Sequence, residues 1–356
     1  MLRSLKIERF RRFERFELYG LGRVNLLVGL NNSGKTSVLE AVHLLTTRDL
    51  PAIHAAALRR GERLFENGGR DADVEIDVCR LFHGFGLSPG SSFRIDGENQ
   101  DQKESVEVEV IESETINSKG ERHDVVSLSL DWNGVRDLHP FTISPRSGVS
   151  WTPTVRFPRG PHGEPVRPVK FIDLSSLTAR EVVSLFGEVV LTPDEATVLE
   201  ALKIIDPTIE RIAPISQEWA APVSGHWGFH VRCTGYDQRI PIGTLGDGVW
   251  RMLGLALALV KSEGGVLLVD EIDAGLHYTA MSDMWRLIYE TAVKTDIQVF
   301  ATTHNSDCWT SLATIIRDRE DSTDISIQRI EPDRGRAVAF SHEEIVIAAE
   351  RDIEVR

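Results

Sequence analysis

Residues 29–36 combine the residue types that bind a triphosphate. They read Gly29-Leu-Asn-Asn-Ser-Gly34-Lys35-Thr36 and match the pattern G-x-x-x-x-G-K-[ST]. A loop of this kind directs backbone N–H groups at phosphate oxygens. We expect Lys35 to neutralise the β and γ oxygens and the Thr36 hydroxyl to join a Mg²⁺ shell.

The segments on either side of this loop are the elements that would position it. The apolar run Val24–Val28 precedes the loop, and a helical pattern covers residues 36–45. A strand, a glycine-rich turn and a helix N-terminus together bring a partial positive charge to one point. The sequence therefore predicts a bound nucleoside triphosphate.

A second apolar run ends in two adjacent carboxylates, Asp270 and Glu271. Beside a phosphate loop, the first carboxylate is expected to hold Mg²⁺ and the second to orient or deprotonate the attacking water. Taken alone, the pattern also fits an ordinary strand followed by an acidic turn. The chain contains no Asn-Lys-x-Asp motif that would read guanine, so ATP is favoured over GTP.

Three further turns could contribute to a nucleotide site. The strand pattern of residues 297–302 leads to His304, which could reach a γ-phosphate, although a lone histidine is usually a surface residue. The turn Asp273–His277 could cross a dimer interface. Gly246 and Gly248 flank Asp247 before a helix of small residues, which is either a helix cap or a second anion site. A second cradle is explained if it meets the triphosphate of a neighbouring copy.

The remaining patterns predict a large α/β fold. Alternating apolar residues over 5–18 predict an edge hairpin, and residues 72–145 alternate as an antiparallel sheet does. Residues 145–168 form a proline-rich loop, and residues 175–210 a helical insertion in which Thr192 caps the second helix. Helices and strands alternate over 240–356, which is typical of a mostly parallel core sheet. We expect one domain over residues 1–356.

The charge balance weighs against a general nucleic-acid coat protein. The 356 residues include 40 Lys and Arg and 54 Asp and Glu, for a net charge of −14, whereas duplex binding relies on clustered basic side chains. Two local basic groups occur, and we interpret them as solvated surface while leaving DNA open as a partner. They are Arg3, Lys6, Arg9, Arg11, Arg12 and Arg15, and Arg156, Arg159, Arg167 and Lys170.

Other features predict a cytoplasmic protein. No apolar stretch reaches the length of about 18 residues that spans a bilayer, and the N-terminus lacks the apolar core of a signal peptide. The three cysteines, Cys79, Cys233 and Cys308, lie far apart without metal-ligand spacing. We expect reduced thiols and no membrane partner.

The order of these motifs resembles that of ABC-type ATPases. More narrowly it resembles the SMC/RecF/OLD-like branch, whose OLD members are the overcoming-lysogenization-defect proteins. The resemblance spans nearly the whole chain and includes the segments 7–13, 24–29, 81–84, 205–207 and 353–356. It implies a P-loop NTPase of ABC type with an antiparallel β-subdomain and a helical insertion.

The resemblance also implies roles for individual residues. Asp270 and Glu271 are the Walker B aspartate and general base, and His304 is the switch histidine. Residues 274–277 are the D-loop, Arg11 or Arg12 lies near the nucleotide, and the signature turn touches the ATP of the partner copy. The implied phosphate ligands are Gly29, Asn31, Asn32, Ser33, Gly34, Lys35, Thr36 and Ser37, and the implied signature residues are Gly246, Asp247 and Gly248.

The chain departs from the pattern at the signature, where Gly246 replaces the usual serine and removes one hydroxyl contact with the γ-phosphate. A Q-loop glutamine is not assigned, and we expect neither coiled-coil arms nor a Toprim nuclease domain. The resemblance implies a homodimer, or a higher even oligomer, that closes head to tail on ATP and gates a separate nuclease or toxin in phage defence or DNA maintenance. Two alternatives stay open: a nucleotide-gated sensor or scaffold with slow hydrolysis, and a RecF-like DNA-binding repair ATPase.

Overall fold

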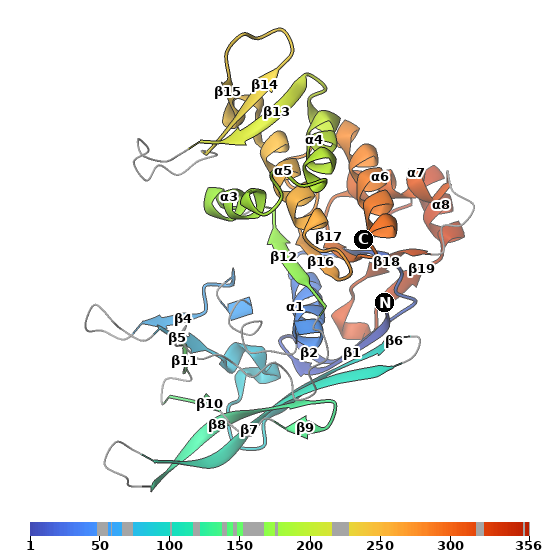
Figure 1. Cartoon of the computed structure of the whole chain (residues 1–356). Helices are drawn as coiled ribbons and strands as arrows, with labels where there is room; N and C mark the ends of the chain where they lie inside the picture. The colour runs from blue at the N-terminus through green and yellow to red at the C-terminus, as the bar shows by residue number, and fades with distance from the viewer. Residues whose placement is uncertain are drawn as a thin grey trace. The chain divides into compact units, whose positions relative to one another are not determined.

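The chain folds into two compact units, each built from separate stretches of sequence (Figure 1). The first unit comprises residues 1–20, 32–167 and 330–338, and the second comprises residues 21–31, 168–329 and 339–356. This computed structural model describes residues 1–47, 56–57, 59–65, 74–99, 102–116, 122–136, 141–144, 148–151, 167–174, 177–215, 228–317, 324–351 and 353–355. Within these ranges, no helix is both long and apolar enough to cross a membrane.

The first unit contains a seven-stranded sheet in the order β10-β8-β7-β6-β1-β2, with β9 paired to β8. The pairings among its described strands are antiparallel, as the alternation of residues 72–145 predicts. The strands are β1 (Leu2–Phe10), β2 (Phe13–Tyr19), β6 (Ser92–Asn99), β7 (Lys103–Ile116), β8 (Arg122–Trp132), β9 (Val135–Arg136) and β10 (Phe141–Thr142). A smaller sheet has the order β11-β5-β4, formed by β4 (Arg63–Phe65), β5 (Val74–Asp77) and β11 (Gly148–Trp151).

Helix α1 (Lys35–Thr47) packs against β6 and β7 of the first unit. The predicted hairpin of β1 and β2 exists, but only β2 lies at an edge, because β1 pairs with both β2 and β6. Its apolar side chains are buried, among them Leu5, Ile7 and Phe16. The alternation of residues 5–18 is therefore the inner face of a larger sheet.

The second unit is built on a six-stranded sheet in the order β12-β16-β17-β3-β18-β19. The pairs β12·β16, β16·β17, β17·β3 and β3·β18 are all parallel, which confirms the mostly parallel core sheet. The strands are β3 (Val24–Val28), β12 (Val169–Asp173), β16 (Val266–Asp270), β17 (Gln298–Thr302), β18 (Ile325–Arg329) and β19 (Val338–Phe340).

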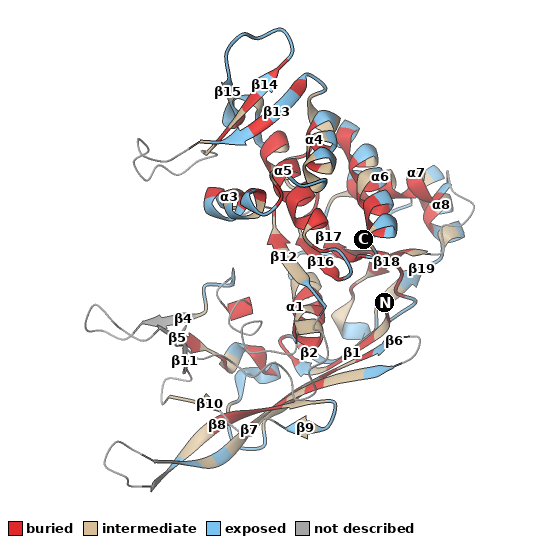
Figure 2. Ribbon diagram, viewed as in Figure 1, coloured by how far each residue is buried: buried red, intermediate tan, exposed pale blue. Residues whose placement is uncertain are grey.

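Helices complete the second unit, and Figure 2 shows how much of α5 is buried. This helix packs against α3, α4, α6 and β12, as an apolar run such as Met252–Val260 requires. The helices are α3 (Ala179–Gly187), α4 (Asp194–Ile205), α5 (Asp247–Val260), α6 (Tyr278–Lys294), α7 (Ser306–Arg317) and α8 (His342–Glu350). A three-stranded sheet, β13-β14-β15, contains β13 (Ile209–Pro214), β14 (Phe229–Cys233) and β15 (Ile240–Pro241).

The helical insertion is present as α3 and α4, but its second cap differs from the prediction. Thr192 does not cap α4, because its hydroxyl donates to the carbonyl of Val189 and Pro193 is the N-cap residue. Most of the proline-rich loop of residues 145–168 lies outside the described residues, with Arg156 and Arg159. Helix α7 follows His304 and was not predicted. Its first residues are polar, so the apolar periodicity of the helix is not evident at its start.

Asn25 joins three neighbouring segments of the parallel sheet. Its side chain is fully buried on β3, where Nδ2 donates to the carbonyls of Gly22 and Val299 at 2.9 and 3.1 Å. Its Oδ1 accepts from the Gly22 N–H at 2.7 Å and from the Ser326 hydroxyl at 2.9 Å. Because β3 leads directly into the phosphate loop, this amide sets where the loop begins.

The substitution Asn25→Leu should lower the free energy of unfolding by about 3 kcal/mol, since it leaves several buried polar groups without partners. Urea unfolding of both proteins measures this difference. The matched control is Asn99→Leu at the end of β6, where the side chain makes a single part-buried bond to Glu104. A loss below about 1 kcal/mol at Asn25 would show that this amide does not hold the sheet.

Candidate active site

The second half of the phosphate loop, Asn32–Thr36, begins α1 in the first unit. Gly34 has φ +103°, and a Cβ atom there would lie 2.4 Å from Cζ of Phe13. Glycine is therefore required both by the backbone conformation and by the ring packed on it. The Gly34 carbonyl accepts from the Val38 N–H at 3.0 Å, which starts the helix directly after the loop.

The surroundings of Ser33 indicate that this loop could bind an anion. The residue is buried, and its Oγ has no hydrogen-bond partner among the described residues. Buried hydroxyls are normally paired, so an unpaired one in a phosphate-loop sequence fits an oxygen of a bound phosphate. The neighbouring Asn32 has φ +58°, a left-handed conformation that asparagine adopts more readily than most residues.

Arg11 lies in a buried ion-pair cluster with the helix that follows the loop. Its Nε is 3.0 Å from Glu40 Oε2, and its Nη1 is 2.6 Å from Glu62 Oε1. Arg60 closes the cluster from outside, with Nε 2.7 Å from Glu40 Oε1. Burial raises the pKa of Glu62, and the nearby Arg11 opposes that rise. The cluster fixes the first turns of α1 to the β1–β2 turn.

The contacts of Arg12 fit the implied position near the nucleotide better than those of Arg11. Its guanidinium donates to the carbonyl of Asn32 within the phosphate loop, whereas the Arg11 side chain is only 5% exposed and bound to glutamates. Arg12 is therefore the better candidate for a nucleotide neighbour, and Arg11 for a residue that positions the loop.

In the second unit, three strand ends meet at one edge of the parallel sheet. The register pairs Leu27 of β3 with Thr302 of β17, and Leu268 of β16 with Phe300 of β17. The strands are parallel, so their carboxyl ends lie at the same edge, where α/β proteins bind ligands. This edge brings together the candidate residues that follow the strands, namely Gly29, Asn31, Asp270, Glu271 and His304.

Thr302 holds both carboxylate residues at this edge. Its hydroxyl donates to Asp270 Oδ1 at 2.5 Å and accepts from the Glu271 N–H at 2.9 Å. Glu271 has φ +50°, an uncommon conformation for a non-glycine residue and one that concentrates at functional sites. The hydroxyl therefore orients the candidate metal ligand and stabilises the turn that carries the candidate base.

Thr303 makes the equivalent contact with the next turn. Its buried hydroxyl donates to Asp273 Oδ1 at 2.6 Å and accepts from the Asn305 N–H at 3.0 Å. Asp273 is itself buried and opens the turn of residues 274–277. His304, between these contacts, has an exposed side chain. The two threonines thus tie the segment before His304 to both turns that follow β16.

The signature turn also lies in the second unit. Gly246 has φ +89° and is the N-cap of α5, so Asp247 and Gly248 form its first turn. A Cβ atom on Gly248 would lie 3.5 Å from the Gly275 carbonyl, so this turn packs beside residues 274–277. Asp247 is exposed, with its carboxylate 3.8 Å from Nη2 of Arg251.

In each unit, the candidate residues fit their own part of a nucleotide with Mg²⁺. The loop supplies an unpaired buried hydroxyl at Ser33 and a glycine cradle at Gly34. Asp270 has one oxygen held by Thr302, and Mg²⁺ is commonly bound by one or two carboxylates together with phosphate oxygens and water. The ligands expected for Mg²⁺ here are therefore all oxygen atoms, which are the hard donors that this metal prefers.

Sequence reasoning missed the residues that position the site. Thr302 is the last residue of β17 and Thr303 directly follows it, and Glu40 is a fully buried charge in α1. Polar residues at such places carry a signal, because burying them requires a partner. The partners themselves lie far away in the sequence and could not be read from it.

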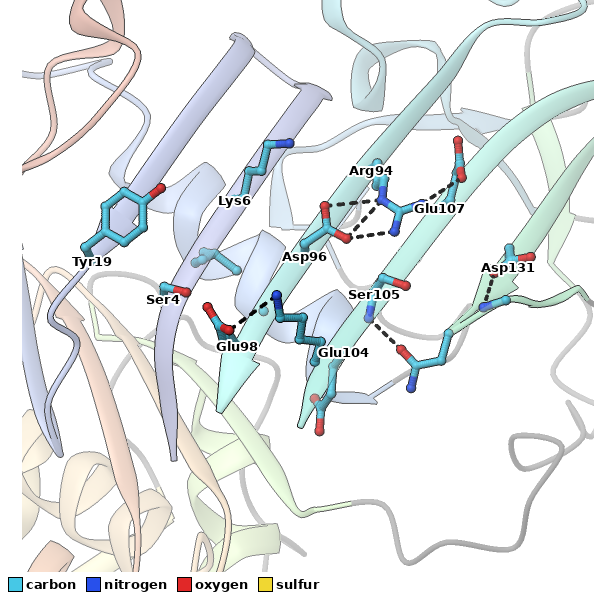
Figure 3. Close-up of a pocket in the computed structure, with 15 residues that line it drawn as sticks. Ser4, Lys6, Tyr19, Arg94, Asp96, Glu98, Glu104, Ser105, Glu107 and Asp131 are labelled. Carbon is cyan, nitrogen blue, oxygen red and sulfur yellow. Dashed lines mark hydrogen bonds and ion pairs between the residues drawn. The ribbon is translucent and has the colours of Figure 1, made fainter. Parts of the chain in front are cut away.

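A separate hollow of about 670 Å³ lies on the solvent face of the antiparallel sheet (Figure 3). Its charged side chains largely pair with one another: Arg94 contacts Asp96 at 2.9 Å and Glu107 at 3.3 Å, and Lys103 contacts Glu98 at 3.5 Å. Lys6 of the N-terminal basic group contributes to its lining, but no residue of the predicted nucleotide site does. We interpret this hollow as a solvated, ion-paired surface.

Comparisons with known proteins agree with this description. A curated "ATP/GTP phosphatase" of Helicobacter pylori is 19% identical over 347 residues, which cover 90% of each chain. Shorter matches occur to "DNA replication and repair protein RecF" of Xanthomonas oryzae (56% over 75 residues, 20% of this chain and 19% of RecF) and of Acinetobacter baumannii (52% over 46 residues, 13% of each).

Solved structures show the same fold. The Smc head domain with an extended coiled coil, bound to the C-terminal domain of ScpA derived from Pyrococcus furiosus, has a TM-score of 0.52 at 13% identity over 99% of each chain. A SmcHead bound to the C-winged helix domain of ScpA has a TM-score of 0.51 at 13% identity, over 96% of this chain and 98% of that one. The predicted ABC-type fold is thereby confirmed.

A family described as "AAA domain, putative AbiEii toxin, Type IV TA system" matches residues 24–307. That range begins at β3 and ends in the first turn of α7, so it includes the phosphate loop, Asp270, Glu271 and His304. The predicted SMC/RecF-like ATPase class agrees with this match and with the RecF relatives. The chain belongs to this family of AAA domains.

Proposed function

We propose that this chain hydrolyses ATP at a site formed by the phosphate loop and the two carboxylates that follow β16. The observation that supports it is the shared edge of the parallel sheet. There the end of β3, which opens the loop, lies in register with the strands that lead to Asp270 and to His304. The Helicobacter pylori relative is named for both ATP and GTP, so both nucleotides belong in every assay.

Each residue has a distinct task in the proposed reaction. Lys35 and the loop N–H groups would bind the β and γ phosphates, and Asp270 and Thr36 would hold Mg²⁺. Bound Mg²⁺ supplies positive charge to the phosphate oxygens. Glu271 accepts a proton from the attacking water, and His304 donates a hydrogen bond toward the γ-phosphate. Thr302 would orient the Asp270 carboxylate through the hydrogen bond to its Oδ1.

Two copies are proposed to close head to tail around ATP. The signature turn of one copy then faces the triphosphate on the loop of the other, with N–H groups at the start of α5 as donors. Gly246 in place of serine removes one hydroxyl donor, which favours slow turnover. A nucleotide-gated sensor or scaffold is therefore the second candidate, and turnover well below about 1 per second would favour it.

The proposed output is the control of a separate effector, either a nuclease or a toxin, in phage defence or DNA maintenance. The family description includes a putative toxin of a toxin–antitoxin system, and the RecF relatives are named for DNA replication and repair. DNA remains a proposed partner on the basis of these relatives, although the N-terminal basic group is partly engaged within the chain: Arg15 pairs with Glu17, and Arg9 donates to Ser92.

Replacing Lys35 by alanine should weaken ATP binding at least 100-fold, because the loop loses its only full positive charge. Equilibrium titration with fluorescent ATP and GTP measures both affinities. Lys294→Ala, in the last turn of α6, is the matched control because its side chain is exposed. Undiminished affinity in the Lys35 variant would contradict the assignment of the loop.

The variant Glu271→Gln should bind ATP normally but hydrolyse it about 100-fold or more slowly, because an amide cannot accept the water proton. Phosphate release measures the rate, and light scattering with ATP should show a doubled mass. The control is Glu263→Gln in the exposed turn before β16. Wild-type turnover in the Glu271 variant would assign the base elsewhere, and an ATP-bound monomer would contradict the head-to-tail pair.

Thr302→Val should raise the Mg²⁺ concentration for half-maximal turnover about tenfold, in the range found when a group that orients a metal ligand is removed. Thr302→Ser keeps the hydroxyl and should restore the wild-type value. Thr310→Val on α7 is the control, since its hydroxyl donates to the carbonyl of Ser306 within the helix. An unchanged Mg²⁺ dependence in the valine variant would remove Thr302 from the metal site.

A further inference from the structure

We propose that Arg251 is a positioning residue that couples the signature turn to the D-loop and to the strand bearing Asp270. This inference rests on the proposed head-to-tail function and deepens it, since it names the residue that transmits occupancy of the signature turn. Arg251 lies one helical turn after Asp247 on α5, and its side chain is 16% exposed.

The guanidinium connects α5 with the edge of the parallel sheet. Nη1 donates to the carbonyl of Leu174, directly after β12. The Leu174 N–H in turn donates to the Asp270 carbonyl at 3.4 Å, continuing the β12·β16 pairing in which Asp173 lies opposite Asp270. One backbone residue therefore separates Arg251 from the candidate metal ligand.

The same side chain lies directly on the D-loop. A Cβ atom on Gly275 would lie 2.4 Å from Nε and 2.7 Å from Cδ of Arg251. Gly275 also has φ +69°, so glycine is required there for conformation and for space. Any movement of the turn 274–277 must therefore move Arg251, and the reverse holds as well.

Arg251 also balances the charge of the signature turn. Asp247 places a carboxylate where the proposed triphosphate would approach, and Nη2 of Arg251 is 3.8 Å from it. That cation offsets part of the negative charge that an incoming anion would meet at the start of α5. The offset acts at the signature turn and not at the phosphate loop.

Nε of Arg251 indicates that the contact between this side chain and the turn 274–277 has a second arrangement. Nε is buried and has no acceptor among the residues that the structure describes, and a buried unpaired donor lowers stability. Nε lies beside the backbone of Gly275, so the turn 274–277 is the neighbouring segment whose movement would change the surroundings of Nε. We infer two states, one with Nε unpaired and one with it bonded, and a triphosphate on the signature turn favours the second.

The test compares Arg251→Met, which keeps the aliphatic stem, with Arg251→Lys, which also keeps the charge. Turnover is measured against ATP concentration, and ATP affinity is measured separately by fluorescence titration. We expect Arg251→Met to bind ATP within about twofold of wild type, with turnover at least tenfold lower and the Hill coefficient reduced to one. Arg251→Lys should be intermediate, because it compensates Asp247 but cannot also reach Leu174 and Gly275 as a planar fork.

The control is Arg286→Met on α6, where a half-exposed arginine pairs with Asp283, and it should behave as wild type. Wild-type cooperativity in Arg251→Met, or ATP affinity and melting temperature that fall together, would overturn the inference. Wild-type turnover without cooperativity would also overturn it, while leaving the ATPase proposal intact. Should Arg251→Met not fold, Arg251→Lys is judged by the same criteria. Loss of the proposed function itself would appear instead as ATP binding that does not depend on Lys35.

Discussion

The parallel pairing of β3 with β17, and of β17 with β16, is the constraint on which the candidate site depends. Parallel strands bring their carboxyl ends to one edge, so residues from three distant parts of the sequence meet there. Asn25 secures the arrangement by bonding to Gly22, Val299 and Ser326 at once. A buried amide with every bond made adds specificity that an apolar residue would not.

At that edge, two threonine hydroxyls form hydrogen bonds that orient neighbouring aspartates. Thr302 and Thr303 each donate to one aspartate and accept from one backbone N–H. Both threonines are buried, so their bonds are formed away from water, where they are stronger and costlier to break. The candidate metal ligand Asp270 and the backbone of the turn that carries Glu271 are therefore held by a hydroxyl to which we assign no part in the chemistry.

The first unit positions its half of the phosphate loop by a different means. Arg11, Glu40 and Glu62 form a buried network of ion pairs at α1, and the exposed Arg60 covers Glu40 from the solvent side. Breaking such a network leaves an uncompensated charge, so its members act together. Gly34 under the Phe13 ring adds a steric restriction. The ion pairs at α1 and the packing of Phe13 on Gly34 together hold the part of the loop that belongs to this unit.

The sequence alone determined the local elements, because turn residues and apolar periodicity act over a few positions. It placed the loop between a strand and a helix, set β14 at Phe229–Cys233, and marked Asp270 and Glu271 at the end of a strand. Only the tertiary structure decided that β1 lies between β2 and β6, that Thr302 bonds Asp270, and that Arg251 covers Gly275. Those facts depend on contacts between residues far apart in the chain, which no local pattern encodes.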